Sequence, residues 1–363
     1  MGSLSVYDQL AEHLNTMPIG APKTPELIEI LKVLFAEEEA ALAVKLPFFP
    51  MNLPALEART GIEAGRLEPL LDRMAGKGTV LVDRSGAEAL YRLLPSVVGF
   101  SETPFWPGKR TPETEKLASL WIKYAANAFY HELGGVSAVP VMRVIPIEET
   151  LADSRQVSTY EKLSEMVKKT DYRAVAHCPC RLMKDYSGMG RCSHTTENCL
   201  HFGGLARYMV AHGMAREITV EETLKILKRS NEEGLVHTTG NYRGEMDTIC
   251  NCCPDACIFL TGLLFMGKQN MFARSNFVCR IDPDTCIACG LCAERCPVKA
   301  IAADDTAASV DANKCIGCGV CHPTCPSESV SLVERPEEEK RPLLKVGEFF
   351  TRIMADKKRE LVP

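Results

Sequence analysis

The sequence predicts an α+β protein of several domains, with a mostly helical, cysteine-rich middle domain. Three observations support this prediction. The chain has 363 residues, more than one domain usually contains. Hydrophobic residues make up 46% of it and charged residues 25%, a balance that allows a sizeable buried core. All 17 cysteines lie between Cys178 and Cys325, so we expect the chemistry of the chain in its second half.

Residues 1–100 have the pattern of a small helical domain that ends in a β-hairpin. Thr24 can cap a helix that begins at Pro25, because a hydroxyl accepts hydrogen bonds from first-turn N–H groups and proline suits the first helical position. Further helices are predicted at Leu53–Thr60 and Glu63–Ala75, and strands at Thr79–Val82 and Ala89–Leu93. Helices followed by a hairpin in this order resemble a winged-helix domain.

The segments on either side of the cysteines have simpler assignments. Residues 101–175 are predicted to form a helical connector, with helices at Glu113–Leu133 and Ser158–Lys169 and an edge strand or extended linker at Val139–Ile147. Residues 334–363 are predicted to form a charged tail with a docking helix, because apolar residues recur there at helical spacing. That apolar stripe consists of Leu343, Val346, Phe349, Phe350, Ile353 and Met354.

Two cysteine runs near the C-terminus carry the strongest signal. The run from Cys286 to Pro297 has the spacing C-x2-C-x2-C-x3-C-P, and the run from Cys315 to Pro326 repeats it 29 residues later. Residues 271–333 therefore resemble a bacterial ferredoxin with two [4Fe–4S] clusters, in which the fourth cysteine of each run ligates the other cluster. The resemblance implies one cluster held by Cys286, Cys289, Cys292 and Cys325, and another held by Cys315, Cys318, Cys321 and Cys296.

A pair of zinc sites is the alternative interpretation of these runs. Zinc ligands usually come as two separated pairs, whereas each run here has three closely spaced cysteines and a Cys-Pro. Gly290, Gly317 and Gly319 would also let backbone N–H groups approach cluster sulfides. The iron–sulfur interpretation is therefore favoured.

Residues 176–270 hold eight more cysteines in two groups, and the sequence leaves their partition open. The first group is Cys178, Cys180, Cys192 and Cys199, and the second is Cys250, Cys252, Cys253 and Cys257. Each group suffices for one further [4Fe–4S] cluster or a zinc ion, so one or two further centres are expected. One site could also draw on both groups, with Cys178 and Cys180 beside Cys250, Cys252 and Cys253. Cys279 stands apart and is interpreted as a buried free thiol.

Histidines and arginines near these cysteines are weaker candidates. His177, His194, His201 and His237 could act as ligands or proton donors, although a single histidine is more often only hydrogen-bonded. His177 and His201 are the strongest of the four because each lies close in sequence to a candidate ligand. Arg181, Arg191 and Arg207 could neutralise a cluster or bind an anion, or could simply be solvated.

Motifs outside the ferredoxin-like part extend the resemblance along the chain. They resemble a group of multidomain 4Fe–4S proteins of bacteria and archaea that have a winged-helix-like N-terminus and no settled activity. The matching stretches are Arg143–Pro146, Cys178–Arg181, Glu233–His237 and Ile249–Cys253. The resemblance implies a shared layout and no particular reaction.

Several function classes lack support in the sequence. No G-x-G-x-x-G fingerprint after a strand and no G-x4-G-K-[ST] loop occurs, so nucleotide binding is not expected. The net charge is −5, and residues 1–100 carry 9 Lys and Arg against 13 Asp and Glu, which argues against nucleic-acid binding. The N-terminus lacks a secretory pattern, and the longest apolar stretch, Cys257–Gly267, is too short to span a membrane. We therefore expect a cytoplasmic protein with reduced thiols.

These observations predict an iron–sulfur electron-transfer protein, acting as the electron-delivering subunit or reductase component of a cytosolic anaerobic redox system. Such a protein needs a redox protein partner, and it could form homo- or hetero-oligomers. The first alternative is an oxidoreductase with its own substrate site at a cluster in the middle domain, since an open metal position can bind substrate. The second is a redox-sensing transcription regulator, against which the acidic N-terminal domain argues.

Overall fold

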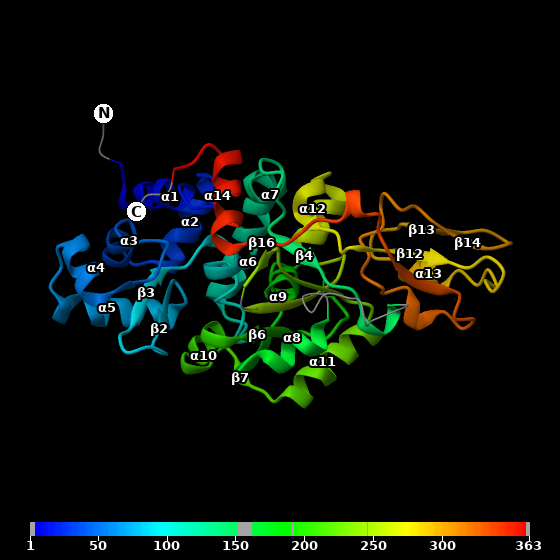
Figure 1. The fold of residues 1–363 in the computed structure, drawn as a ribbon. Coiled ribbons are helices and arrows are strands. Elements are labelled where there is room, and N and C mark those ends of the chain that lie inside the picture. The colour runs from blue at the N-terminus through cyan, green and yellow to red at the C-terminus, as the bar shows by residue number, and fades with distance from the viewer. Residues whose placement is uncertain (1–3, 152–161, 191, 245, 361–363) are drawn as a thin grey trace.

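The fold was analysed in a computed structural model that describes residues 4–151, 162–190, 192–244 and 246–360. Figure 1 shows N-terminal helices at one end, a central sheet with helices on both faces, and a smaller C-terminal lobe at the other end. The first residues of the helix predicted at Ser158–Lys169, and Arg191, lie outside the described residues.

Helices and a small antiparallel sheet of order β1-β3-β2 make up the N-terminal part. Thr24 caps α2 as expected, since its hydroxyl oxygen accepts a hydrogen bond from the Leu27 N–H at 3.2 Å. The predicted helices and hairpin are present here. The elements are α1 (Val6–Asn15), α2 (Pro25–Leu34), α3 (Glu37–Ala43), β1 (Met51–Asn52), α4 (Leu53–Thr60), α5 (Ala64–Lys77), β2 (Val80–Asp83) and β3 (Leu90–Leu93).

The segment predicted as a helical connector contributes to the core. Its helix α6 (Pro112–Tyr124) packs against α2 on one side and α9 (Pro179–Tyr186) on the other. Trp106 and Trp121 of this segment are buried. α6 continues through a π-helical turn, Ala125–Phe129, into α7 (Tyr130–Gly134). The N-terminal and central parts therefore share one continuous hydrophobic core.

Seven strands of the described residues form the central sheet, in the order β11-β4-β8-β10-β6-β5-β7. Neighbouring strands are antiparallel except for β11 and β4. The strands are β4 (Met142–Val144), β5 (Arg173–His177), β6 (Glu197–Phe202), β7 (Arg216–Glu217), β8 (Val236–Gly240), β10 (Thr248–Cys252) and β11 (Phe272–Ala273). Helices α8 (Leu163–Lys169), α9, α10 (Gly203–Ala211), α11 (Val220–Glu232) and α12 (Ile258–Phe265) accompany the sheet.

Two sequence predictions need correction here. The middle domain was predicted to be mostly helical, but it is organised on this sheet. The strands were missed because β6 and β10 carry Cys, Asn and His in place of the regular apolar–polar alternation that identifies a strand. Val139–Ile147 was predicted to be an edge strand or linker, but β4 lies between β11 and β8. Its prolines, Pro140 and Pro146, flank the strand and do not interrupt its hydrogen bonding.

The register of the sheet sorts the side chains of β6 and β10 onto two faces. Ile249 pairs with Leu200, and both belong to an apolar cluster that includes residues of α8 and α11. Thr248 pairs with His201, and because side chains alternate along a strand, Cys250, Cys252 and Cys199 share their face. The cysteine-bearing face therefore points away from α8 and α11, toward the N-terminal part.

The C-terminal lobe contains two small antiparallel sheets and short helical turns. The strands are β12 (Phe277–Ile281) with β15 (Val330–Glu334), and β13 (Ile301–Ala303) with β14 (Ala308–Val310). The lobe also contains α13 (Leu291–Arg295) and the 3₁₀ turn His322–Thr324, and further 3₁₀ turns of the chain are Glu148–Thr150, Gln269–Met271 and Glu337–Glu339.

After the lobe the chain returns across the molecule to the N-terminal helices (Figure 1). There β16 (Leu344–Lys345) pairs with β9 (Tyr242–Arg243), and α14 (Val346–Asp356) follows. Phe349, Ile353 and Met354 of its apolar stripe are buried. Next to the helix, Lys357 contacts the buried carboxylate of Glu132 at 2.6 Å, and Arg359 does the same.

Candidate metal centres

The two cysteine runs of the C-terminal lobe lie close together. Burial, followed by the charges of the neighbouring cysteines, raises the pKa of the Cys318 thiol. Those neighbours are Cys321, Cys315 and Cys296, so Cys296 of the first run lies beside the second run, as crossed ligation requires. Cys325 of the second run also lies near Cys321, with the Ser329 hydroxyl 3.2 Å from its sulfur.

Backbone N–H groups point at several of these sulfurs. Ala300 N–H donates to Cys296 Sγ at 3.2 Å, and Ala308 N–H donates to Cys286 Sγ at 3.4 Å. Gly317 has a φ of +68°, and a Cβ at this position would lie 2.2 Å from the carbonyl oxygen of Phe277, so only glycine fits. Thiolates in tight loops with N–H donors around them are the donor set that iron–sulfur clusters need.

Cys279 is a buried free thiol, as the sequence suggested, but it does not stand apart from the two runs. It is buried, and its sulfur lies 3.6 Å from that of Cys321. Its backbone N–H also donates to Cys315 Sγ at 3.5 Å. The sequence missed this contact because it arises from the pairing of β12 with β15 and not from the spacing of the runs.

The two runs face different surroundings. Among the seventeen cysteines, all of which the structure describes, Cys289 of the first run is the exposed one. Its neighbours Ile287 and Leu291 are 62% and 42% exposed. The second run instead contacts the central part of the molecule, where the Ile147 N–H donates to the Cys318 carbonyl at 3.0 Å. Arg295, at the end of the first run, links both parts, since it donates to the carbonyl oxygens of Val320 in the second run and Glu232 in the central part.

Six cysteines of the middle region form one group on the sheet face described above. They come from both groups of the sequence, and each interacts with the next in the order Cys178, Cys180, Cys257, Cys252, Cys250 and Cys199. The Thr238 hydroxyl also lies 3.6 Å from Cys252 Sγ. This geometry is closer to the single site that draws on both groups than to one separate centre for each group of four cysteines. The site differs from the predicted one because it includes Cys257 and Cys199 and leaves Cys253 out.

Cys253 pairs instead with Cys192. Their sulfurs are 3.5 Å apart, and one carboxylate oxygen of Asp255 lies within 4.8 Å of both. The pKa of Cys192 is lowered to about 7, mainly by its contact with Cys253. His194 lies nearby, 3.7 Å from Glu233, and its charge acts on Asp255. Asp255 was not among the candidates from the sequence. The signal for it is that its carboxylate, a possible zinc ligand, comes two residues after the thiol of Cys253.

Arg181 lies beneath the middle cysteines as a buried cation. Its side chain is 1% exposed, and its guanidinium donates to the Asn198 side chain at 2.9 Å and to the Asn251 carbonyl at 2.8 Å. The charges of Cys178, Cys253 and Cys192 act on it. This cation therefore lies close to both groups of thiols. Its position fits the role considered from the sequence, in which Arg181 neutralises the negative charge of a cluster. Arg207 is instead an exposed partner of Asp171.

A chain of hydrogen bonds joins the middle cysteines to the C-terminal lobe. Asn251, which lies between Cys250 and Cys252, contacts His237 Nδ1 at 2.6 Å, and His237 Nε2 contacts Asn231. The backbone carbonyl of Asn231 accepts from Arg295 of the lobe. Burial lowers the pKa of His237 to about 4, so its imidazole is neutral near pH 7 and acts as a hydrogen-bonded link.

The remaining histidines show no contact with a candidate ligand sulfur among the described residues. His177 Nδ1 contacts the Thr196 hydroxyl at 3.1 Å. His201 is fully buried against the Trp106 ring, with centroids 5.0 Å apart, and burial lowers its pKa to about 3. Tyr130, which the sequence did not single out, lies beside Cys180 and Cys257, and burial and then these cysteines raise its pKa to about 12.

Comparison with known proteins identifies the C-terminal lobe. The family model of the 4Fe–4S dicluster domain matches residues 279–332, which contain both cysteine runs. No curated protein matches the chain. Every helix of the described residues is too short or too polar to cross a membrane.

Proposed function

We propose that this chain, with its C-terminal 4Fe–4S dicluster domain, is an electron-transfer protein that connects an external redox partner with the thiol-rich site on its central sheet. One observation carries the proposal. The first cysteine run is exposed at Cys289, while the second is held against the central part through the Cys318 carbonyl. An electron carrier between two sites needs one side open to a partner and the other facing the second site.

The residues of the lobe fit two clusters, held by the crossed sets predicted from the sequence. When bound, [4Fe–4S] clusters supply one-electron transfer. The chain holds the thiolates in place, surrounds them with N–H donors and covers the second run. Ile287 and Leu291 offer an apolar contact surface next to Cys289, where we propose that the redox partner docks.

In the middle region, the donor sets favour two different centres. The six-cysteine group offers soft ligands on a preformed sheet face, which suits one further iron–sulfur cluster. Cys192 and Cys253 suit a single zinc ion, because two thiolates about 2.3 Å from one ion lie about 3.8 Å apart. Their observed sulfur separation is 3.5 Å, and Asp255 supplies a third ligand that His194 can complement.

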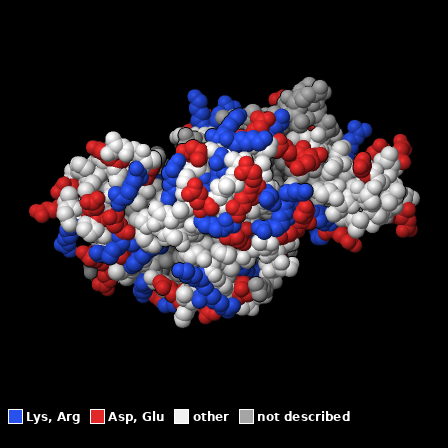
Figure 2. Space-filling model, turned by 90° about the horizontal axis from the view of Figure 1, so that it is seen from below, with Lys and Arg blue, Asp and Glu red and all other residues white. Residues whose placement is uncertain are grey.

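We further propose that residues 1–100 are a winged-helix-like module that packs against the body and does not read DNA. The helix that would enter a DNA groove is α5, and its basic residues Arg66 and Arg73 face Glu38, at 3.0 and 3.6 Å. Figure 2 shows acidic and basic side chains interspersed on the face that it displays, without a continuous basic surface. These observations disfavour the transcription regulator.

The cellular role we propose is that of an electron-delivering subunit or reductase component in a cytoplasmic, anaerobic redox system. An oxidoreductase with its own substrate site in the middle region is the second candidate. One observation favours it: the cysteine-bearing face of the sheet continues past Thr248 into a cavity.

Metal analysis of anaerobically purified protein tests the proposal. We expect about twelve iron atoms and one zinc ion per chain, from three cubane clusters and one single-ion site. Cys252→Ser should remove about four iron atoms and leave the zinc in place, whereas Asp255→Asn should lower zinc alone. About eight iron atoms in the unmodified protein would limit the clusters to the dicluster domain and contradict the middle cluster.

A further inference from the structure

A mainly apolar cavity of about 410 Å³ lies next to the sheet face that carries the six-cysteine group. It lies between the hairpin of the N-terminal part, the central sheet and α14. Phe48, Phe349, Phe350 and Trp106 contribute aromatic walls. Phe49 and Val346, which are 46% and 40% exposed, mark its opening to solvent. This volume falls within the range of small-molecule sites.

One cation lines this mainly apolar space. Arg92 of β3 borders the cavity, and burial lowers the pKa of its guanidinium. No carboxylate of the described residues forms an ion pair with it. Asp247, the acidic residue that lines the same cavity, acts on Arg92 through its charge, but burial raises the pKa of its carboxyl, which accepts a hydrogen bond from the Tyr242 hydroxyl at 2.9 Å. A half-buried guanidinium without an ion-pair partner is costly unless a bound anion compensates for its lost hydration.

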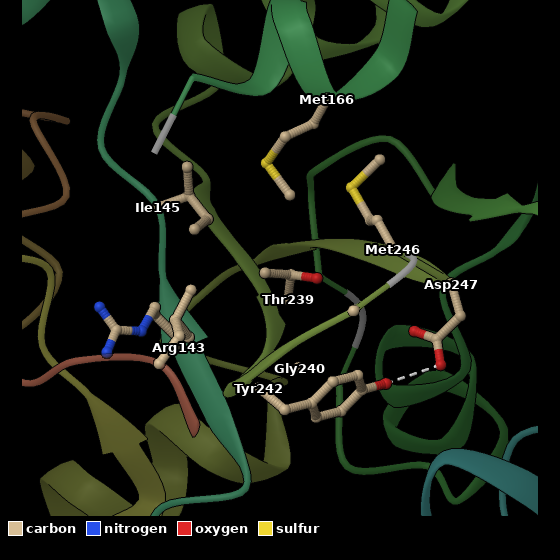
Figure 3. Close-up of a pocket in the computed structure, with 10 residues that line it drawn as sticks. Arg143, Ile145, Met166, Thr239, Gly240, Tyr242, Met246 and Asp247 are labelled. Atoms are coloured by element: carbon tan, nitrogen blue, oxygen red, sulfur yellow. Dashed lines mark hydrogen bonds between the residues drawn. The ribbon is translucent and has the colours of Figure 1, made fainter. Parts of the chain in front are cut away.

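Figure 3 shows a neighbouring recess that shares Tyr242 and Asp247 with the cavity. The Tyr242–Asp247 hydrogen bond is part of the wall of this recess, which is also lined by Arg143, Ile145 and Met166. That recess has only about 20 Å³, which is room for a water molecule and not for an organic ligand. The ligand-sized space is therefore on the Arg92 side.

The wall opposite the opening leads to the cysteines. Thr248 lines the cavity, and Cys250 is the next residue on the same face of β10, roughly 7 Å further along the strand. Trp106 also lines the cavity, is 1% exposed, and its indole N–H has no hydrogen-bond partner among the described residues. Buried indole N–H groups usually find an acceptor, so an acceptor from a ligand would complete this wall.

We propose that this cavity binds a small organic anion, with its charged group at Arg92 and its apolar body among the aromatic rings. Shape and charge both favour such a ligand, because the walls are apolar and aromatic while the one cation has no ion pair with a carboxylate of the described residues. The binding site stands on the cavity alone. That the ligand is also the molecule with which the middle cysteines exchange electrons rests on the proposed function.

Two fluorescent probes with the same ring system test the site in the full-length protein. 8-Anilinonaphthalene-1-sulfonate carries an anionic group, and N-phenyl-1-naphthylamine does not. We expect saturable binding of one sulfonate probe per chain. Arg92→Gln should weaken it by about tenfold or more, as loss of a charge-assisted contact implies, and should change binding of the neutral probe less than about twofold. Arg84→Gln, an exposed arginine of the same hairpin, is the matched control and should change neither.

Blocking the opening provides an independent test. Val346→Trp, at the exposed rim, should weaken both probes if they enter the cavity. Displacement by 2-naphthoate or by 2-naphthyl phosphate would show whether a carboxylate or a phosphate is preferred. Equal sulfonate-probe affinity in Arg92→Gln, unchanged binding in Val346→Trp, or no displacement by either competitor would overturn the proposal. Iron content should be unchanged in Arg92→Gln, so failure of this site and failure of the proposed function are distinguishable.

Discussion

The dicluster domain and the six-cysteine group both gather thiols, but they do so in different ways. In the dicluster domain, each run of cysteines lies on one loop, and the spacing alone brings three of them together. In the middle region, Cys178 and Cys180, which follow β5, join Cys257 and the cysteines of β10 only because β5, β6 and β10 pair side by side in one register. The first kind of site depends on the spacing of cysteines within one loop, whereas the second depends on how distant strands pair in the folded protein.

This difference predicts how each site responds to damage. A loop site should fail locally when one ligand is removed. A site assembled across a sheet should also depend on residues that never touch a metal, such as the buried Arg181 and its asparagine partners. The following substitutions test this contrast.

The largest effect is expected from a ligand of the dicluster domain. Cys296→Ala should remove about half of the iron of that domain, about four atoms, because a cubane with three thiolates is labile. Since Cys296 lies beside Cys318, the cluster of the second run should be lost. Electron paramagnetic resonance of the reduced protein should show one dicluster signal in place of two interacting ones. Loss of the cluster of the first run would contradict crossed ligation.

Arg181→Met should damage the middle region without touching a ligand. Removing a buried cation leaves Asn198 and the Asn251 carbonyl without a donor, which we expect to lower the free energy of unfolding by about 3–5 kcal/mol. Urea unfolding measures this change. The exposed Arg207 pairs with Asp171 at 2.8 Å, and Arg207→Met should cost less than about 1 kcal/mol. Equal effects of the two substitutions would remove the distinction between the two kinds of site.

A buried acid should make the middle region sensitive to pH. Burial raises the pKa of Glu102 from 4.5 to about 7, and its charge acts on Cys199. Because the folded state holds this proton more tightly, stability should fall as the pH rises from about 4.5 to 7 and stay lower above it, by up to about 3 kcal/mol.

Glu102→Gln should remove most of that dependence and raise the melting temperature at pH 8. The exposed Glu115, which pairs with Arg110, provides the control, and Glu115→Gln should leave the dependence in place. A pH profile of Glu102→Gln that matches the unmodified protein would show that Glu102 is not the group responsible.

The smallest effect is expected where the two regions meet. Arg295 of the lobe donates to carbonyl oxygens on both sides of the junction, so Arg295→Met should destabilise the docking of the lobe by about 1.5 kcal/mol. Amide hydrogen exchange near Ile147 should increase about tenfold. The same change at the exposed Arg280 should have no effect there.

Some of the fold was accessible from local sequence. Thr24 with Pro25 predicted the start of α2, and the two short strands predicted at Thr79–Val82 and Ala89–Leu93 gave the β2–β3 hairpin, because caps and hairpins depend on residues close in sequence. The central sheet was not accessible in this way. Its strands β6 and β10 carry Cys199, His201, Cys250 and Asn251, and residues chosen for chemistry hide the period of two that identifies a strand.

For the candidate sites, the sequence by itself determined the dicluster domain, because cysteines separated by two or three intervening residues on one loop meet whatever the rest of the chain does. Only the tertiary structure decided the grouping in the middle region. Strand pairing across some fifty residues of chain unites Cys199 with Cys250, and the end of β10 at Cys252 separates Cys253, which turns to Cys192 and Asp255. The spacing of cysteines along the chain does not determine such contacts, because they depend on the register of strand pairing. A shift of one residue in that register would move every side chain of a strand to the other face of the sheet.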